Sequence, residues 1–342
     1  MFWSKILRFF SEDIAMDLGT ANTLLYTRDG GIIVNEPSVV AIDTRNNEVL
    51  AVGSEAKRAR GRTPKRIKTI RPMKSGVIAD FDTTSRMIVY FVNKAIGRSH
   101  LVKPSLVISV PTGITGVEKK AVIDAAATAG AGRISLIEEP MAAAIGADLP
   151  VTEPVGTLIA DIGGGTSEVA VITMSAITVS QSIRIAGDAM NEILLRMLRD
   201  KYRLDVGENT AEHLKILLGS TQPVPDLPDY AEISGRDLVS GVPMTKKVTS
   251  EDVRLALKEP VEEIASAVMR VLEKTPPELA ADIYTSGFCL AGGSSLLRGL
   301  PELLSDRTGL HVFVTEDPLT AVLRGTAKAM QDRKNYKGVF LS

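Results

Sequence analysis

Cysteine and long apolar runs are scarce in this sequence. Cys289 is the single cysteine among 342 residues, so no disulfide can form within the chain, as suits a reducing compartment. Its apolar setting, F-C-L-A, favours a buried structural thiol over a nucleophile. No stretch approaches the roughly 20 apolar residues that a membrane-spanning helix needs, so we expect no such helix.

An excess of either charge is also missing. The 40 lysines and arginines nearly balance the 41 aspartates and glutamates, and a formal net charge of −1 provides no general attraction to nucleic acid or membranes. Basic residues do gather between Lys57 and Lys74, but no aromatic residues alternate with them for base stacking. We therefore predict a solvated face or a subunit contact there, and no nucleic-acid partner.

What the chain does have is the size and balance of a two-domain globular protein. Its 342 residues are too many for one core, and 44% hydrophobic with 24% charged residues is ordinary for a folded chain. We expect two domains of the α/β type.

The stretch 158–168 carries the most chemistry, with the sequence L-I-A-D-I-G-G-G-T-S-E. An apolar strand leads to Asp161, and Gly163, Gly164 and Gly165 predict a tight turn before a second strand over 168–174. Without Cβ atoms, glycines let backbone N–H groups close around a phosphate. An aspartate assists there only if a divalent cation such as Mg²⁺ lies between the two anions. The stretch predicts a nucleotide–metal site; a simple glycine-rich β-hairpin is the alternative.

The same pattern occurs near the N-terminus, in I-A-M-D-L-G-T-A-N-T-L-L-Y. Asp17 matches Asp161 and Gly19 matches Gly163, and apolar strands flank both copies. An internal duplication of this kind predicts two similar halves. Two phosphate-binding hairpins could then clamp a polyphosphate from both sides.

Two neighbouring acids, Glu138 and Glu139, stand where a strand over 134–137 meets a helix over 141–147. They are candidates for orienting or deprotonating water. Acids at a helix N-terminus also complement the helix dipole, which is the structural alternative.

Further candidates lie in the second half of the chain. Glu212 and Lys215 share one face of a helix over 209–219, either as ligand contacts or as a surface ion pair of little consequence. The turn in F-C-L-A-G-G-S-S-L-L (288–297) would let a flat ring or a ribose approach the backbone. We also expect Pro260 to interrupt the helical stretch 251–273, and the polar tail after Gln331 to be loose.

The first twelve residues, M-F-W-S-K-I-L-R-F-F-S-E, form an amphipathic pattern. Lys5 and Arg8 lie opposite the apolar face, as in a helix lying in a membrane interface. Packing of this face on the protein itself is the alternative. Leu101 and Val102, flanked by cations, form either a loop tip that touches lipid or the entry to the next strand. The predicted apolar face consists of Phe2, Trp3, Ile6, Leu7, Phe9 and Phe10.

The spaced motifs D-L-G-T, D-I-G-G-G-T and A-G-G-S are those of the actin/Hsp70/hexokinase ATPase superfamily. Within it the chain resembles the MreB family of bacterial actins, with N-E-P-S-V-V-A (35–41), I-R-P-M-K-S-G-V-I-A-D-F (70–81) and E-E-P-M-A-A-A-I-G (138–146). The resemblance covers about 14–330.

The resemblance implies an α/β, actin-like ATPase fold. Two duplicated ribonuclease-H-like domains, each with an inserted smaller subdomain, would surround a nucleotide cleft. After a membrane-binding segment over 1–12, the implied division is subdomain IA (13–31, 76–149 and 320–342), IB (32–75), IIA (150–187 and 256–319) and IIB (188–255).

The resemblance also implies a site for ATP or ADP with Mg²⁺. Asp17 and Asp161 would hold the metal, largely through water. The implied catalytic residues are Glu139, which would activate the attacking water, Thr166, which would help it, and Asp161. The implied nucleotide contacts are Asp17, Gly19, Thr20, Ala21, Asn22, Asp161, Gly163, Gly164, Gly165, Thr166, Gly187, Glu212, Lys215, Gly292, Gly293 and Ser294.

Proteins of this family form antiparallel double filaments on the inner membrane and direct cell-wall synthesis and rod shape. The resemblance therefore implies a cytoplasmic, membrane-peripheral filament whose slow ATP hydrolysis regulates it, with itself, membrane lipids, RodZ and MreC as partners. A small-molecule (sugar) kinase of the same superfamily is the alternative function. A chaperone of that superfamily is disfavoured, because no peptide-binding domain follows the ATPase core.

The departures from the family pattern lie at the adenosine end of the site, in 212–219 and at Ser294. His213 stands where the family has arginine, and Ser294 stands where glycine is usual. These leave open the ribose and base contacts and the preference for ATP or GTP, while the phosphate and metal residues match.

Overall fold

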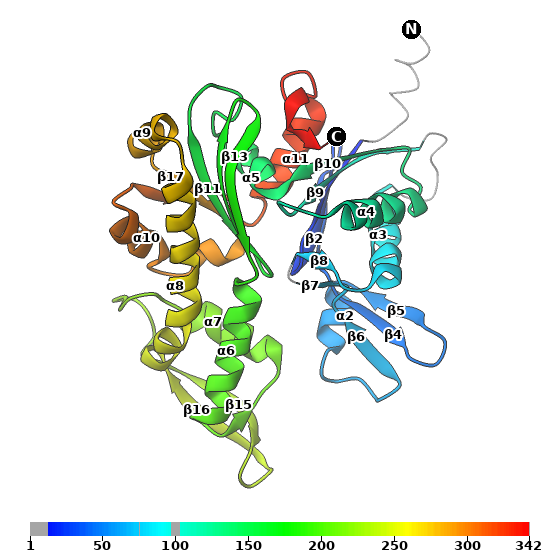
Figure 1. Ribbon diagram of the computed structural model, residues 1–342. Coiled ribbons are helices and arrows are strands. Elements are labelled where there is room, and N and C mark those ends of the chain that lie inside the picture. The colour runs from blue at the N-terminus through cyan, green and yellow to red at the C-terminus, as the bar shows by residue number, and fades with distance from the viewer. Residues whose placement is uncertain (1–12, 75, 97–102, 342) are drawn as a thin grey trace.

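The computed structural model describes residues 13–74, 76–96 and 103–341, which form two α/β lobes lying side by side (Figure 1). Over these residues the first lobe is built on a six-stranded sheet of order β19-β10-β9-β1-β2-β3. Its strands are β1 (Ile14–Leu18), β2 (Asn22–Thr27), β3 (Gly31–Pro37), β9 (Ser105–Val110), β10 (Arg133–Glu138) and β19 (Phe340–Leu341).

The second lobe repeats this plan in a five-stranded sheet of order β13-β12-β11-β17-β18. In each lobe an antiparallel three-strand meander adjoins parallel strands, β9 in one case and β17 in the other. The repeated order fits the predicted duplication. The strands are β11 (Thr157–Ile162), β12 (Ser167–Thr173), β13 (Ala176–Ile183), β17 (Phe288–Ala291) and β18 (Val312–Val314).

A smaller sheet is inserted in each lobe, at the lower end in Figure 1. In the first lobe β4 (Val40–Asp43), β5 (Glu48–Val52) and β6 (Ile67–Ile70) carry α2 (Ser54–Ala59), and β7 (Met73–Lys74) pairs with β8 (Val77–Ile78). In the second, β14 (Leu204–Asp205), β15 (Tyr230–Asp237) and β16 (Pro243–Thr249) lie near α6 (Gly187–Asp200) and α7 (Glu208–Leu218). The subdomain boundaries given above stay a prediction.

Helices cover the large sheets of both lobes. On the first lobe lie α3 (Phe81–Ile96), α4 (Gly116–Thr128) and α11 (Ala321–Gln331), which packs on β1, β2 and β9. On the second lie α8 (Ser250–Lys274), α9 (Pro277–Ser286) and α10 (Leu300–Thr308), while α5 (Glu139–Gly146) contacts strands of both large sheets. Short 3₁₀ turns lie at Gly293–Leu296 and Lys337–Val339. In the described part of the chain no helix is long and apolar enough to cross a bilayer.

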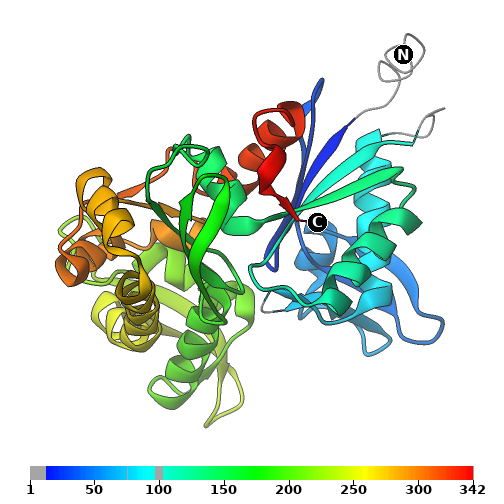
Figure 2. The same ribbon diagram turned by 45° about the horizontal axis from the view of Figure 1, so that its top comes forward.

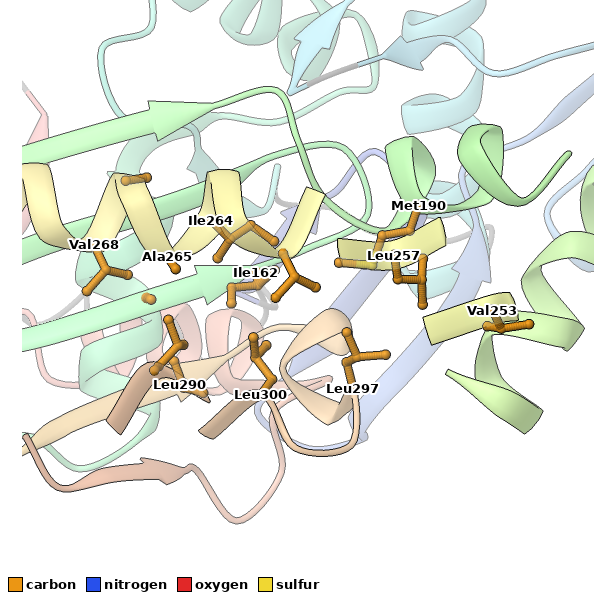
Figure 3. Packing of buried hydrophobic residues seen from close by; sticks show 14 of the residues in the cluster. Ile162, Met190, Val253, Leu257, Ile264, Ala265, Val268, Leu290, Leu297 and Leu300 are labelled. Atoms are coloured by element: carbon orange, nitrogen blue, oxygen red, sulfur yellow. The ribbon is translucent and has the colours of Figure 1, made fainter. Parts of the chain in front are cut away.

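The expected interruption of the helix at Pro260 is wrong. α8 runs unbroken from Ser250 to Lys274 with a buried Pro260 inside it. Proline removes one helical hydrogen bond at a cost of about 3 kcal/mol. Several buried side chains of α8, Leu257 and Ile264 among them, face Leu290 and Leu300 across the core (Figure 3). Burial of each such side chain stabilises the fold by roughly 1.5–3 kcal/mol, so together they outweigh the cost of the proline.

The expected loose tail is also wrong. The last strand, β19, pairs with β10, and Val339 is buried just before it. The Arg333 guanidinium lies 4.9 Å from the ring centroid of Phe340. The tail therefore packs on the edge of the first sheet through three consecutive apolar residues, 339–341. Figure 2 shows that this end of the chain lies between the two lobes.

The two lobes meet where α5 crosses α11. A Cβ added at Gly146 would lie 1.9 Å from the Ala321 carbonyl oxygen, and one added at Gly325 would lie 1.7 Å from that of Ala142. Only glycine permits such an approach of two backbones. One buried cluster combines this crossing with side chains from both large sheets, so the junction has a continuous core.

Cys289 lies in β17 and is fully buried, as the sequence predicts. Burial raises the pKa of its thiol to about 12, which leaves it a structural apolar residue.

Candidate functional site

A cavity of about 660 Å³ opens between the two lobes. All the residues that the resemblance assigns to the nucleotide line it, from Asp17 in β1 to Ser294 after β17, together with Glu139. The structure thus brings these positions together around one space. The role of each one stays a prediction.

The first glycine loop, 17–22, joins β1 to β2 and is held by Ser38. The Ser38 hydroxyl donates to the Gly19 carbonyl oxygen at 2.6 Å, and its backbone N–H donates to that of Ala21 at 2.9 Å. Below the loop, the Ser109 hydroxyl donates to Asp17 Oδ1 at 3.1 Å. The loop is therefore fixed before any ligand arrives.

The second loop, 161–166, joins β11 to β12 and is held by the start of α6. The backbone N–H groups of Gly187 and Asp188 donate to the carbonyl oxygens of Gly163 and Gly164, at 3.2 Å and 2.7 Å. The Ser294 hydroxyl also donates to the Gly163 carbonyl oxygen, at 2.8 Å. The serine that departs from the family pattern thus supports the loop directly.

The two loops touch each other across the lobes. A Cβ added at Gly164 would lie 2.6 Å from the Ala21 Cβ, and one at Gly165 would lie 2.6 Å from Thr20 Oγ1. The glycines are required here by close approach. A polyphosphate beside this contact would meet backbone N–H groups from both lobes.

Asp17 and Asp161 stand at matching ends of β1 and β11 and repel one another. Burial raises the pKa of Asp17 to about 6, against the effect of the Ser109 hydrogen bond. Burial and then the charges of Asp17 and Glu168 raise the pKa of Asp161 to about 8. Two acids with this mutual repulsion suit a cation between them.

The two carboxylates, Asp17 and Asp161, suit Mg²⁺ better than a metal ion that is coordinated by protein side chains alone. Within the described ranges, no group of three or more His, Cys, Asp or Glu side chains is arranged to hold an ion by itself. Mg²⁺ is ordinarily bound through one or two carboxylates, waters and substrate phosphates. Asp17 and Asp161 could supply the carboxylates for such an ion.

Glu139 begins α5 and lines the cavity. Burial raises its pKa well above the usual value, and the charges of Glu168, Asp17 and Asp161 raise it further. A carboxylate with a raised pKa is a better proton acceptor for water. Its place in the cavity wall agrees with a role in chemistry beyond complementing the helix dipole.

Glu168 is a buried acid close to the second loop that the sequence patterns did not single out. It accepts hydrogen bonds from the backbone N–H of Thr112, at 3.1 Å, and from the Ser182 hydroxyl, at 3.0 Å. Burial raises its pKa to about 7, although these hydrogen bonds oppose the rise. The signal was present as one acid in the otherwise apolar strand E-V-A-V-I.

Glu212 and Lys215 do not form the surface ion pair that was the alternative. Glu212 pairs with Lys57 of the other lobe at 2.8 Å, while Lys215 Nζ donates to the Gly187 carbonyl oxygen at 2.9 Å. Burial lowers the pKa of Lys215. The basic stretch is accordingly more than a solvated face, because Lys57, Arg60 and Arg71 line the cavity.

The predicted membrane-contacting residues do not belong to the part of the chain that the structure describes. The segment 1–12, with Phe2, Trp3, Ile6, Leu7, Phe9 and Phe10, and the pair Leu101 and Val102 lie outside the described residues.

Known proteins provide an independent comparison. The family model described as MreB/Mbl protein matches residues 11–338. The cell shape-determining protein MreB of Escherichia coli (strain K12) is 47% identical over 332 residues, which cover 96% of this chain and 95% of that protein. The cell shape-determining protein Mbl of Bacillus subtilis (strain 168) is 46% identical over 317 residues, covering 93% and 95%.

Solved structures agree with this relationship. MreB5 of Spiroplasma citri bound to ADP has a TM-score of 0.90 at 33% identity, covering 95% of this chain and 97% of that one. The MamK double helical filament, at 21% identity, covers 94% and 99% with a TM-score of 0.79 and supports the fold alone. The predicted actin-like fold class is confirmed, and the chain belongs to the MreB/Mbl family of cell shape-determining proteins.

Proposed function

We propose that this chain is an ATP-dependent, actin-like filament protein that acts at the inner face of the cytoplasmic membrane. The observation that supports it most is the contact between Gly164 and Gly165 of one lobe and Ala21 and Thr20 of the other, beside a cavity of about 660 Å³. A ligand with several phosphates can bind both lobes at once there. MreB5 of Spiroplasma citri has been solved with ADP and with AMPPNP, which agrees with this ligand class.

In this proposal the backbone N–H groups of the two loops bind the phosphates. Asp17 and Asp161 hold Mg²⁺, largely through water, and the ion neutralises phosphate charge when bound. Gly292 and Gly293 lie beside the adenosine, together with Glu212 and Lys215. Ser294 holds the second loop and so takes part indirectly.

Glu139 accepts the proton of the attacking water. Its carboxylate stands in the cavity wall, where burial and then the charges of nearby acids raise its pKa and so increase its basicity. Thr166, at the end of the second loop, helps to orient that water through its hydroxyl. Hydrolysis then serves as a timer for the filament, since slow turnover separates an ATP-bound state from an ADP-bound state.

We further propose that the filaments are antiparallel pairs that bind lipid through the N-terminal segment and the loop around 101–102. RodZ and MreC are the expected partners in cell-wall synthesis. These elements rest on family membership and on the amphipathic pattern of residues 1–12.

Sedimentation and electron microscopy test the proposal. With Mg²⁺ and ATP, the protein should pellet as double filaments and gather on anionic vesicles, whereas protein without nucleotide should stay largely in the supernatant. ADP release stimulated by a sugar, without any pelleting, would instead support the kinase alternative.

A further inference from the structure

Three ion pairs join the two lobes, and all six of their side chains line the cavity. Each has a cation from the basic stretch of the first lobe and an acid from α6 or α7 of the second. The N–O distances are 2.8 Å for Lys57–Glu212, 2.7 Å for Arg60–Glu208 and 2.6 Å for Arg71–Asp188.

Arg71 differs from the other two cations in what else it contacts. Its Nη2 lies 2.6 Å from Asp188 Oδ2 and 3.3 Å from the Thr20 carbonyl oxygen, which belongs to the first glycine loop. The Asp188 backbone N–H in turn donates to the Gly164 carbonyl oxygen, in the second loop, at 2.7 Å. A short path of hydrogen bonds therefore runs from Thr20 through Arg71 and Asp188 to Gly164.

The chemistry of the pair suits this path. The side chains of Arg71 and Asp188 are 22% and 27% exposed, so solvent screens their attraction only in part. The two N–H groups of one guanidinium nitrogen, Nη2, point in fixed directions in the plane of the group, so Arg71 can donate to the Thr20 carbonyl and the Asp188 carboxylate together. A lysine would bring a single ammonium on a flexible stem.

We propose that Arg71 is a positioning residue that couples the two phosphate loops, so that both grip one polyphosphate together. This inference rests on the nucleotide-binding function proposed above. Thr20 and Gly165 already lie in contact. Through its hydrogen bonds to Thr20 and Asp188, Arg71 fixes the backbone of the first loop relative to that of the second. Binding of a ligand whose phosphates contact both loops depends on the relative position of the loops. Binding of a ligand without phosphates does not.

The first test measures release of a fluorescent ATP analogue, chased with unlabelled ATP in the presence of Mg²⁺. Arg71→Ala should speed release about tenfold, the scale of a partly screened charged hydrogen bond. Arg71→Lys should recover only part of the loss. Competition by adenosine, which has no phosphate, should be the same in all variants, whereas a general folding defect would weaken it too.

A double-mutant cycle tests the path itself. If Arg71 acts through Asp188, then Asp188→Asn should speed release as Arg71→Ala does, and combining them should add little. Asp188→Asn is a mild change, so it keeps the test valid should Arg71→Ala fold poorly. Lys68→Ala, an exposed residue of the same basic stretch outside the cavity, is the matched control.

Arg60→Ala separates loop coupling from simple closure of the cleft. Arg60 also pairs across the lobes, with Glu208, but within the described residues this pair makes no hydrogen bond to either glycine loop. Equal acceleration by Arg60→Ala and Arg71→Ala would overturn the inference, and so would an unchanged release rate in Arg71→Ala. Failure of the wild-type protein to bind the analogue would refute the proposed function instead.

Discussion

At the residue scale, Glu139 offers the sharpest separation of binding from chemistry. In Glu139→Ala, ATP should still bind, because both glycine loops remain, and filaments should still form. Phosphate release should fall by about 10²-fold or more, the scale of a lost general base. Parallel measurement of nucleotide binding and phosphate release checks this. Normal phosphate release would exclude Glu139 and direct attention to its neighbour Glu138, whose alanine variant is the natural control.

Glu168 should make the free energy of unfolding decrease as the pH rises. Its pKa is raised from 4.5 to about 7, so the folded protein holds this proton more tightly than the unfolded chain. The resulting stability is complete below pH 4.5 and is lost as the pH rises through about 7.

Glu168→Gln should therefore flatten the pH dependence of stability. Without nucleotide and Mg²⁺, the difference in urea midpoint between about pH 5 and about pH 8 should be smaller in this variant than in wild type. Glu232→Gln, on an exposed position of β15, is the matched control. An unchanged pH dependence in Glu168→Gln would show that Glu168 does not bind that proton.

Which site residues can be predicted from sequence depends on how they are connected. Asp17 and Asp161 are found because each ends a short local pattern, and the pattern occurs twice. Arg71 and Asp188 are 117 positions apart, and neither stands in a motif that refers to the other. Such pairs arise only when the two lobes fold against each other, so sequence patterns leave them unseen.

At the element scale, the crossing of α5 and α11 leaves no space for an added side-chain atom at Gly146 or Gly325. In Gly146→Ala a methyl group would meet the Ala321 carbonyl oxygen at 1.9 Å, so two helix backbones must separate. We expect a loss of about 1–3 kcal/mol or more, as in other overpacked sites. Thermal unfolding followed by circular dichroism measures it.

Gly116→Ala is the matched control for this change. Gly116 begins α4, and a Cβ there would meet nothing within 4 Å. Alanine has the higher helix propensity, so stability should stay level or rise slightly. Equal melting temperatures for Gly146→Ala and wild type would mean that the crossing can relax without cost.

Most elements follow from periodicity, and the failures have physical causes. The buried strands around Asp17 and Asp161 are continuous apolar runs, which are simple to recognise. Sequence alone does not predict the continuous helix through Pro260, because helix propensity is a local quantity, whereas the core on one face of α8 is assembled from distant strands. It does not predict the ordered tail either, because 339–341 is too short to show periodicity and its pairing with β10 is long-range.

At the scale of the whole molecule, membrane binding should depend on assembly. Trp3 is the only tryptophan in the chain, so tryptophan fluorescence reports on the N-terminal segment alone. If the predicted segment inserts, a single copy would bury few side chains at interfacial depth and should bind weakly, with Lys5 and Arg8 adding about 1 kcal/mol each on anionic lipid. A filament multiplies these contacts. We expect a blue shift with anionic vesicles that is strongest with ATP.

A deletion and the free protein provide the controls for that prediction. Removing residues 1–10 should weaken vesicle binding and leave ATP hydrolysis largely intact, with any remaining binding due to Leu101 and Val102. A Trp3 spectrum already blue-shifted without lipid, and unchanged on adding it, would mean that the segment packs on the protein itself.

The burial of Cys289 has a practical consequence for spectroscopy. Because this thiol is enclosed within β17 and its pKa is raised to about 12, maleimide reagents should leave it untouched in the folded protein. A cysteine-free background is then unnecessary. Dye or spin labels could be attached at two exposed positions, Arg62 on the first lobe and Asp226 on the second, by substituting each with cysteine. The distance between the labels would report any change in the separation of the lobes when nucleotide is added.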